Sequence, residues 1–209
     1  GDTTQGPLNI CITVLGEVPR GQALLRSGAR VGDDIYASGT LGDARLALQA
    51  LQGRITLTPE ALAAARLRLE APTPRVALGQ ALRGIAHSAI DVSDGLLGDL
   101  GHLLRASGVG ACVDTASTIN LIAASAHHIS ATGQFDTELL AQCTLAGGDD
   151  YELVFTAAPA QRSAIAAAAL ASATPVTRIG TIEAAPGLRL IDAHGQPVTQ
   201  RYASFDHFA

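Results

Sequence analysis

The chain has 209 residues and a formal net charge of −5, and it contains neither methionine nor lysine, so all 14 basic residues are arginine. The absence of lysine excludes P-loop, protein-kinase and Schiff-base sites, which each require one. The acidic balance argues against nucleic-acid binding through a basic face, and no apolar run is long enough for a membrane span. Because Gly1 is not methionine, we expect it not to be the native start.

In the first half of the chain, apolar runs and helix-capping residues predict alternating strands and helices. A glycine- and proline-containing stretch at 16–21 indicates a domain boundary. Thr58-Pro59 and Thr73-Pro74 each predict a helix start, with threonine as the N-cap and proline in the first turn. Strands are expected at 8–16, 34–38 and 88–92, a short helix at 23–30 and a longer one at 41–51.

The second half opens with the clearest helix pattern of the chain. Between 95 and 107, leucines recur at i, i+1, i+4, i+7 and i+8, and Gly108 follows as a stop signal. Strands are expected at 111–113, 151–156, 175–179 and 188–191, and a helix at 159–171, whereas 116–135 shows no clear pattern. Strands that alternate with helices predict a layered α/β domain.

The stretch 90–96, Ile-Asp-Val-Ser-Asp-Gly-Leu, lies where a predicted strand meets the leucine-rich helix. In an extended backbone Asp91 and Ser93 point to the same side, and Asp94 stands where a helix N-cap is expected. Two carboxylates this close together suit Mg²⁺, which prefers carboxylate oxygens, water and substrate phosphate. The alternative interpretation is purely structural, with one aspartate in a turn and the other capping the helix.

A second acidic stretch, 147–153, reads Gly-Gly-Asp-Asp-Tyr-Glu-Leu and enters a predicted strand. Its glycines allow the backbone to approach a ligand closely. Alternation places Asp149 and Tyr151 on one side of the strand and Asp150 and Glu152 on the other. Carboxylates this crowded repel one another unless a cation or several donors compensate them. The structural alternative is a glycine turn with solvated charges.

The remaining polar features are weaker. The opening Gly-Asp-Thr-Thr, 1–4, offers a carboxylate and two hydroxyls but also fits a polar turn, and Arg26 alone is typical of a solvated surface residue. The six histidines show no ligand spacing, and no nucleophile elbow or dinucleotide fingerprint occurs. The three cysteines have neither zinc nor redox spacing and are interpreted as buried thiols in a reducing compartment.

Taken together and in this order, the motifs resemble the C-terminal two-thirds of bacterial thiamine-monophosphate kinases. The matching stretches are GDTTQGPL at 1–8, LLRSGA at 24–29, GDDIYASGTLGD at 32–43, PTPR at 72–75, AIDVSDGL at 89–96, GGDDYEL at 147–153 and FDHF at 205–208. The resemblance covers nearly the whole chain. Only 116–145 matches loosely.

The resemblance implies an architecture shared with aminoimidazole ribonucleotide synthetase, selenophosphate synthetase and a hydrogenase maturation factor. In that architecture an N-terminal ATP-binding domain pairs its sheet with that of a second subunit, which implies a homodimer. Residues 1–19 would be the tail of this domain, and 20–209 would form the C-terminal α/β domain. A cytoplasmic protein with no membrane or nucleic-acid partner is expected.

The resemblance also implies roles for single residues. Asp2, Asp91 and Asp94 are expected to bind several Mg²⁺ ions, and Gly1, Asp2, Arg26 and Ser93 to contact ATP. Asp149 is expected to lie near the cationic thiamine. Phe205 would lie against its rings, as a cation–π contact allows. The implied reaction converts ATP and thiamine phosphate into ADP and thiamine diphosphate, and it needs no strong base because the acceptor is already a phosphate anion.

Two alternatives remain open at this stage. One is another ATP-using member of the same superfamily, of the selenophosphate or aminoimidazole ribonucleotide synthetase type, although the stretches at 147–153 and 205–208 fit thiamine kinases better. The other is a non-catalytic binding or dimerisation fragment. Because the kinases that the chain resembles carry further metal-binding aspartates upstream, we expect the 209-residue chain not to turn over ATP alone.

Overall fold

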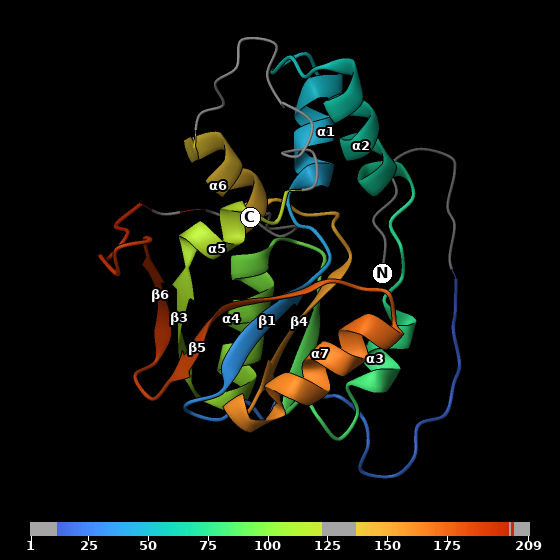
Figure 1. The fold of residues 1–209 in the computed structure, drawn as a ribbon, viewed down its shortest axis with the longest axis vertical. Coiled ribbons are helices and arrows are strands. Elements are labelled where there is room, and N and C mark those ends of the chain that lie inside the picture. The colour runs from blue at the N-terminus through green and yellow to red at the C-terminus, as the bar shows by residue number, and fades with distance from the viewer. Residues whose placement is uncertain (1–11, 123–136, 201, 203–209) are drawn as a thin grey trace.

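The fold is built on a six-stranded sheet with helices around it (Figure 1). It is known from a computed structural model, which describes residues 12–122, 137–200 and 202. The spatial order is β2-β4-β1-β5-β3-β6. Neighbouring strands are antiparallel except for β3 and β6. The strands are β1 (Asp34–Ser38), β2 (Ser88–Val92), β3 (Gly110–Asp114), β4 (Glu152–Ala157), β5 (Val176–Glu183) and β6 (Gly187–Ile191).

Helices cover both faces of the sheet and one of its ends. Helices α3 (Val76–Ala81) and α7 (Arg162–Ala171) lie on one face, and α4 (Leu96–Ser107) lies on the other (Figure 1). Beyond one end of the sheet lie α1 (Asp43–Leu51), α2 (Pro59–Glu70) and α6 (Thr137–Ala146), with the short α5 (Thr115–Ile119) beside α6. At this end β1 and β2 finish and β4 begins.

Strand alternation divides the core into two layers. In β1, Ile35 and Ala37 belong to the cluster under α4, to which the leucines of that helix contribute. Tyr36 points to the opposite face and stacks on Phe155, with ring centroids 5.2 Å apart and planes 13° from parallel. A third cluster joins α1, α2 and α6. The predicted α/β layered class is confirmed.

Most of the predicted elements are present. Strands β1 and β2 have the predicted bounds, Thr58 caps α2 by accepting a hydrogen bond from the Ala61 N–H, and Gly108 ends α4 in a left-handed conformation with φ 67°. The expected buried thiol is found at Cys143, where burial raises the pKa to about 12. Cys112 is half-buried, and Cys11 lies outside the described residues.

Two predicted elements near the start are wrong. Residues 23–30 form no helix: the Leu25 carbonyl accepts a hydrogen bond from the Ala89 N–H at 2.9 Å, and Gly28 has φ 120°, so this stretch runs along β2 in a turn conformation. The expected strand at 8–16 is not formed over 12–16, where Val14 and Leu15 are 85% and 91% exposed and no described strand pairs with them. Residues 8–11 lie outside the described part.

The structure differs from the predictions in smaller ways at two helix starts, and it contains two helices that were not predicted. Helix α3 begins at Val76 with Arg75 at the N-cap position, rather than at Thr73, and the stretch 159–171 opens with a 3-10 turn before α7. Helices α5 and α6 were not predicted, because their short sequences lack a strong apolar period. Within the described residues, no helix combines the length and the apolar character needed to cross a bilayer.

Candidate active site

The turn between β2 and α4 carries two of the predicted site residues, Asp91 and Asp94. Asp91 is exposed on β2, and Ser93 and Asp94 are half-buried. Gly95, with φ 120°, holds the N-cap position of α4, so the predicted capping role of Asp94 is wrong. The buried carboxylate of Asp99, from the first turn of α4, accepts hydrogen bonds from the amides of Ser93 and Asp94, each at 3.0 Å, and thereby shapes the turn.

The pKa of the same Asp99 carboxyl depends on its burial and on the charges of the turn. Burial raises its pKa above the ordinary aspartate value, and the hydrogen bonds from the backbone of Asp94 and Ser93 act against this rise. The negative charges of Asp94 and Asp91 raise the pKa further. The charges of Asp91 and Asp94 thus make the electrostatic potential at this end of the sheet more negative, which favours a cation there.

The turn before β4 lies directly against the turn after β2. The Asp149 N–H donates to the Ser93 carbonyl at 2.9 Å, and the Tyr151 N–H donates to the Val92 carbonyl at 2.9 Å. A side chain at Gly148 would place its Cβ 2.6 Å from the Ser93 carbonyl oxygen, so only glycine permits this approach. The structure thus brings the two acidic motifs of the sequence together.

The predicted alternation along this second turn is present. Asp149 and Tyr151 are exposed, whereas Asp150 and Glu152 are fully buried. Asp149 and Tyr151 both have positive φ, 67° and 51°, a conformation that residues other than glycine adopt rarely. The exposed acid therefore sits on a backbone that its surroundings must hold in place.

Asp150 fastens the turn to helix α1. Both oxygens of its carboxylate lie within 3.0 Å of the Gly42 N–H, and the Ala44 amide also donates to it, so Asp150 occupies the N-terminus of α1. Burial raises the pKa of Asp150 well above the ordinary aspartate value, although these amides act in the opposite direction. The role of Asp150 is therefore to anchor the turn inside the protein.

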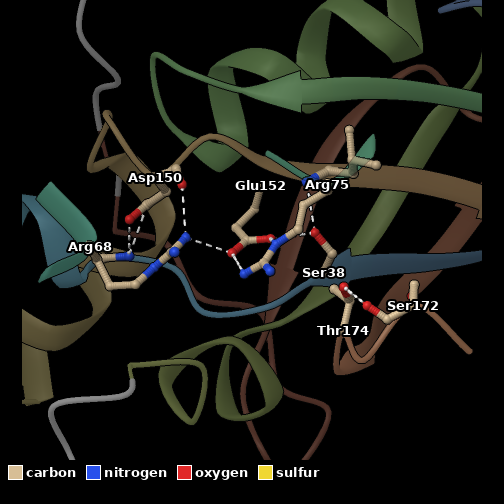
Figure 2. Close-up of polar contacts among 9 residues, drawn as sticks. Ser38, Arg68, Arg75, Asp150, Glu152, Ser172 and Thr174 are labelled. Carbon is tan, nitrogen blue, oxygen red and sulfur yellow. Dashed lines mark hydrogen bonds and ion pairs between the residues drawn. The ribbon is translucent and has the colours of Figure 1, made fainter. Parts of the chain in front are cut away.

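Glu152 is the centre of a buried ion-pair network (Figure 2). Arg75 donates two hydrogen bonds to its carboxylate, from Nε to Oε2 at 2.7 Å and from Nη2 to Oε1 at 2.5 Å. Arg68 Nη2 lies 2.7 Å from Oε1, and the Ser38 hydroxyl donates to Oε2 at 2.6 Å. Ser38 in turn accepts from the Leu153 N–H at 2.8 Å, which ties β1 to the start of β4.

A largely apolar cavity of about 540 Å³ opens beside the two turns. Asp91 and Tyr151 line it, together with Arg75. Its other lining residues come from the connection between α2 and α3, from α3 itself and from β4: Pro72, Pro74, Val76, Gly79 and Leu153. Largely apolar ligands suit a cavity with this lining and with few polar groups.

Asp91 and Asp94 have the donor chemistry that magnesium prefers, namely carboxylate oxygens, and Asp91 is exposed while Asp94 is half-buried. Within the described ranges, no group of three or more His, Cys, Asp or Glu side chains is arranged to hold a metal ion. The two aspartates therefore fit as part of a coordination shell that water, substrate phosphate or other carboxylates would complete.

Arg26 is not brought to these turns. Its side chain is exposed. Its backbone carbonyl accepts a hydrogen bond from the hydroxyl of Ser107, which is the last residue of α4. Asp94 precedes that helix, whose 12 residues span about 18 Å. The other predicted contacts, Gly1, Asp2 and Phe205, lie outside the described residues.

Sequence reasoning missed the supporting residues of the site. Arg68, Arg75 and Ser38 lie 77 to 115 positions from the residues they contact, and no local pattern reveals such pairs. Asp99 did leave a signal, because an aspartate among the apolar positions of the leucine-rich helix has to find hydrogen-bond donors. Glu152 was noticed only as one member of an alternating set.

Comparison with known proteins identifies the family of the chain. The model of the family described as AIR synthase related protein, C-terminal domain, matches residues 30–193. Thiamine-monophosphate kinases from Salmonella typhimurium and Escherichia coli are each 42% identical over 214 residues. These alignments cover all of this chain and 62% of each relative, so the chain spans less than two-thirds of their length.

Solved structures give the same result. The thiamine-monophosphate kinase of Stenotrophomonas maltophilia superposes with a TM-score of 0.72 and 45% identity, over 87% of this chain and 56% of that one. AaThiL complexed with AMPPCP and TMP superposes with a TM-score of 0.65 and 27% identity, over 88% of this chain and 54% of that one. Escherichia coli HypE, 18% identical with a TM-score of 0.64, over 92% of this chain and 56% of that one, shares the fold. The chain therefore belongs to the AIR synthase related protein family and contains its C-terminal domain.

Proposed function

We propose that this protein is a thiamine-monophosphate kinase, which transfers the γ-phosphate of ATP to thiamine phosphate in a single in-line step. An oxygen of thiamine phosphate forms the new bond to the γ-phosphorus, the bond to the bridging oxygen breaks, and ADP leaves. The proposal rests on the 42% identity to thiamine-monophosphate kinases and on the AMPPCP and TMP bound by AaThiL. The observation that carries it is the junction of the two acidic turns, which gathers Asp91, Asp94 and Asp149.

Each residue has a separate task in this proposal. Asp91 and Asp94, with Asp2, hold Mg²⁺, which when bound neutralises charge on the polyphosphate. Ser93, with Gly1, Asp2 and Arg26, contacts the nucleotide. Asp149 places a carboxylate near the cationic ring of thiamine, against which Phe205 lies. A base is unnecessary because the attacking oxygen is already anionic, so the residues act by positioning and by electrostatics.

The assembly belongs to the same proposal. A homodimer formed through an N-terminal ATP-binding domain follows from the resemblance to the kinases. Arg26, far from Asp94 in this chain, would then meet nucleotide at a different part of the site. We propose this arrangement for the longest natural form of the protein.

The test measures ADP release with Mg²⁺ and thiamine phosphate in the longest natural form of the protein. Asp91→Asn should lower turnover roughly 100-fold or more, because removal of a metal ligand removes charge neutralisation. Asp192→Asn is the matched control: Asp192 accepts hydrogen bonds from two amides in a turn after β6, which asparagine can also do, so turnover should not change.

Three results would contradict the proposal in different ways. Unchanged turnover in Asp91→Asn would give that aspartate a purely structural role. Thiamine phosphate binding without ADP formation in the unmodified protein would favour a binding module. ADP formation that requires a different acceptor would favour another member of the superfamily.

A further inference from the structure

The ion-pair network around Glu152 does more than fill the core, because of where Glu152 stands in the chain. It is the first residue of β4, pairs with Val92 and directly follows the exposed turn residues Asp149 and Tyr151. Its two arginines flank the connection between α2 and α3: Arg68 is in the last turn of α2, and Arg75 is at the N-cap of α3. The network therefore fixes the end of the turn.

The Glu152 carboxylate is fully buried and closely packed against Gly39. Gly39 packs against it so tightly that a Cβ at that position would overlap its oxygens. Arg68 also donates from Nη2 to the Asp150 carbonyl at 3.1 Å, so one guanidinium holds both Glu152 and the backbone of the turn (Figure 2). Displacing the carboxylate would weaken one of the contacts that hold the backbone of the turn that carries Asp149.

The network also borders the cavity beside the turns. Tyr151 and Leu153, the neighbours of Glu152 in the chain, both line the cavity, and so does Arg75. One pair of side chains, Glu152 and Arg75, thus connects the shape of the cavity with the position of the exposed acid.

We propose that Glu152, held by Arg75, Arg68 and Ser38, is a positioning residue that presents Asp149 and Tyr151 to the substrate. The inference rests on the proposed function as far as the substrate is thiamine phosphate. The placement of the turn itself can be tested without any ligand.

The chain offers a matched control at the other end of the same sheet. Asp34 is likewise a buried carboxylate that accepts from two arginines, Arg162 and Arg178, and from one hydroxyl, that of Tyr36. It pairs with Ala157, the last residue of β4, whereas Glu152 is the first. Asp34→Asn and Glu152→Gln therefore remove the same charge from networks with the same kinds of partner, although Arg162 and Arg178 are more exposed than the arginines of Glu152, and only Glu152 adjoins the turn.

The first measurement is hydrogen exchange of the Asp149 and Tyr151 amides, followed by mass spectrometry or NMR. Glu152→Gln should lower their protection about tenfold more than Asp34→Asn does, because local opening of the turn becomes easier. Equal losses in the two variants would overturn the proposal. If Glu152→Gln does not fold, Arg75→Lys keeps the charge but loses the two-pronged contact, and it should give a smaller loss in the same amides.

The second measurement is the KM for thiamine phosphate in the longest natural form of the protein. Glu152→Gln should raise it about tenfold, while Asp34→Asn leaves it unchanged. Because Glu152 acts through Asp149, adding Asp149→Asn to Glu152→Gln should raise KM little further, and additive effects would overturn the proposal. If the unmodified protein does not use thiamine phosphate, the proposed function fails, and the exchange experiment still decides the positioning role.

Discussion

Asp34 gives the clearest single-residue prediction of pH dependence. The hydrogen bond from Arg162 lowers its pKa below the ordinary 3.8, burial of the carboxyl opposes this, and Arg178 adds to the lowering. Because the folded state favours the ionised form, this stabilisation is present above about pH 4 and is lost as the pH falls below 3.8. Both arginines are at least half exposed, so we expect about 1 kcal/mol.

The measurement is the Tm of the unmodified chain and of Asp34→Asn across pH 2.5 to 7. The variant should melt about 2–4 °C lower at pH 7, and the difference should shrink toward pH 3. A difference that stays constant with pH would contradict the assignment of the stabilisation to the charge on Asp34.

Single residues also show where sequence reasoning ends. Period-two alternation correctly separated Asp149 and Tyr151 from Asp150 and Glu152, although Asp149 and Tyr151 have positive φ and β4 begins only at Glu152. It could not tell which pair would be buried, since this depends on donors that come from α1, α2 and α3. Asp94 does not cap α4 for a related reason: the amides of Ser93 and Asp94 are bound by Asp99, whose carboxylate in the first turn of the helix reaches back over the preceding loop.

At the level of elements, the contact between the two acidic turns depends on Gly148. Gly148→Ala would bring a Cβ within 2.6 Å of the Ser93 carbonyl oxygen and 3.4 Å of the Asp94 Cα, so the turns must move apart. We expect a loss of about 1–3 kcal/mol in the free energy of unfolding, measured by urea denaturation.

Gly101→Ala in α4 is the control for this substitution. There the nearest atom to a new Cβ is the end of the flexible Arg105 side chain at 3.5 Å, so alanine should stabilise the helix by about 0.5–1 kcal/mol. A Gly148→Ala variant that is as stable as the unmodified chain, or more stable, would show that the close approach at Gly148 has no energetic cost.

Helices whose apolar period or capping residue is visible in the local sequence were predicted correctly, whereas segments without such signals were not. The leucine period of α4 and the Thr58 cap of α2 are local signals and gave correct helices. The stretch 23–30 looked like a short helix, but its conformation is set by hydrogen bonds to β2 and to the end of α4, which are distant in sequence. Local propensity is a weak guide where tertiary contacts decide.

At the level of the whole molecule, the strand order could not be predicted from the sequence. Strand β4 lies between β2 and β1, although it follows both by many residues, and this insertion brings the turns at 92–94 and 148–151 together. Sequence reasoning identified both motifs as candidates on chemical grounds. The contact between them was not predicted, because it depends on this strand order.

The boundary between residues 19 and 20 stays a prediction that limited proteolysis can test. Among the described residues, the stretch 12–24 makes one backbone hydrogen bond, from the Gln22 N–H to the Pro19 carbonyl, and its side chains are mostly exposed. Arg20 lies in this turn, whereas the Arg26 carbonyl is bound by Ser107. Trypsin should therefore cut first after Arg20.

The product beginning at Gly21 should keep the six-stranded sheet, because all of its strands and helices lie beyond the cut. Mass spectrometry identifies the cleavage site, and circular dichroism should give a Tm within about 3 °C of that of the intact chain. Early cleavage after Arg54 or Arg83, which lie in exposed turns inside the α/β domain, would contradict this expectation. A product that unfolds at room temperature would move the boundary, because it would show that residues before Gly21 are part of the same cooperative unit.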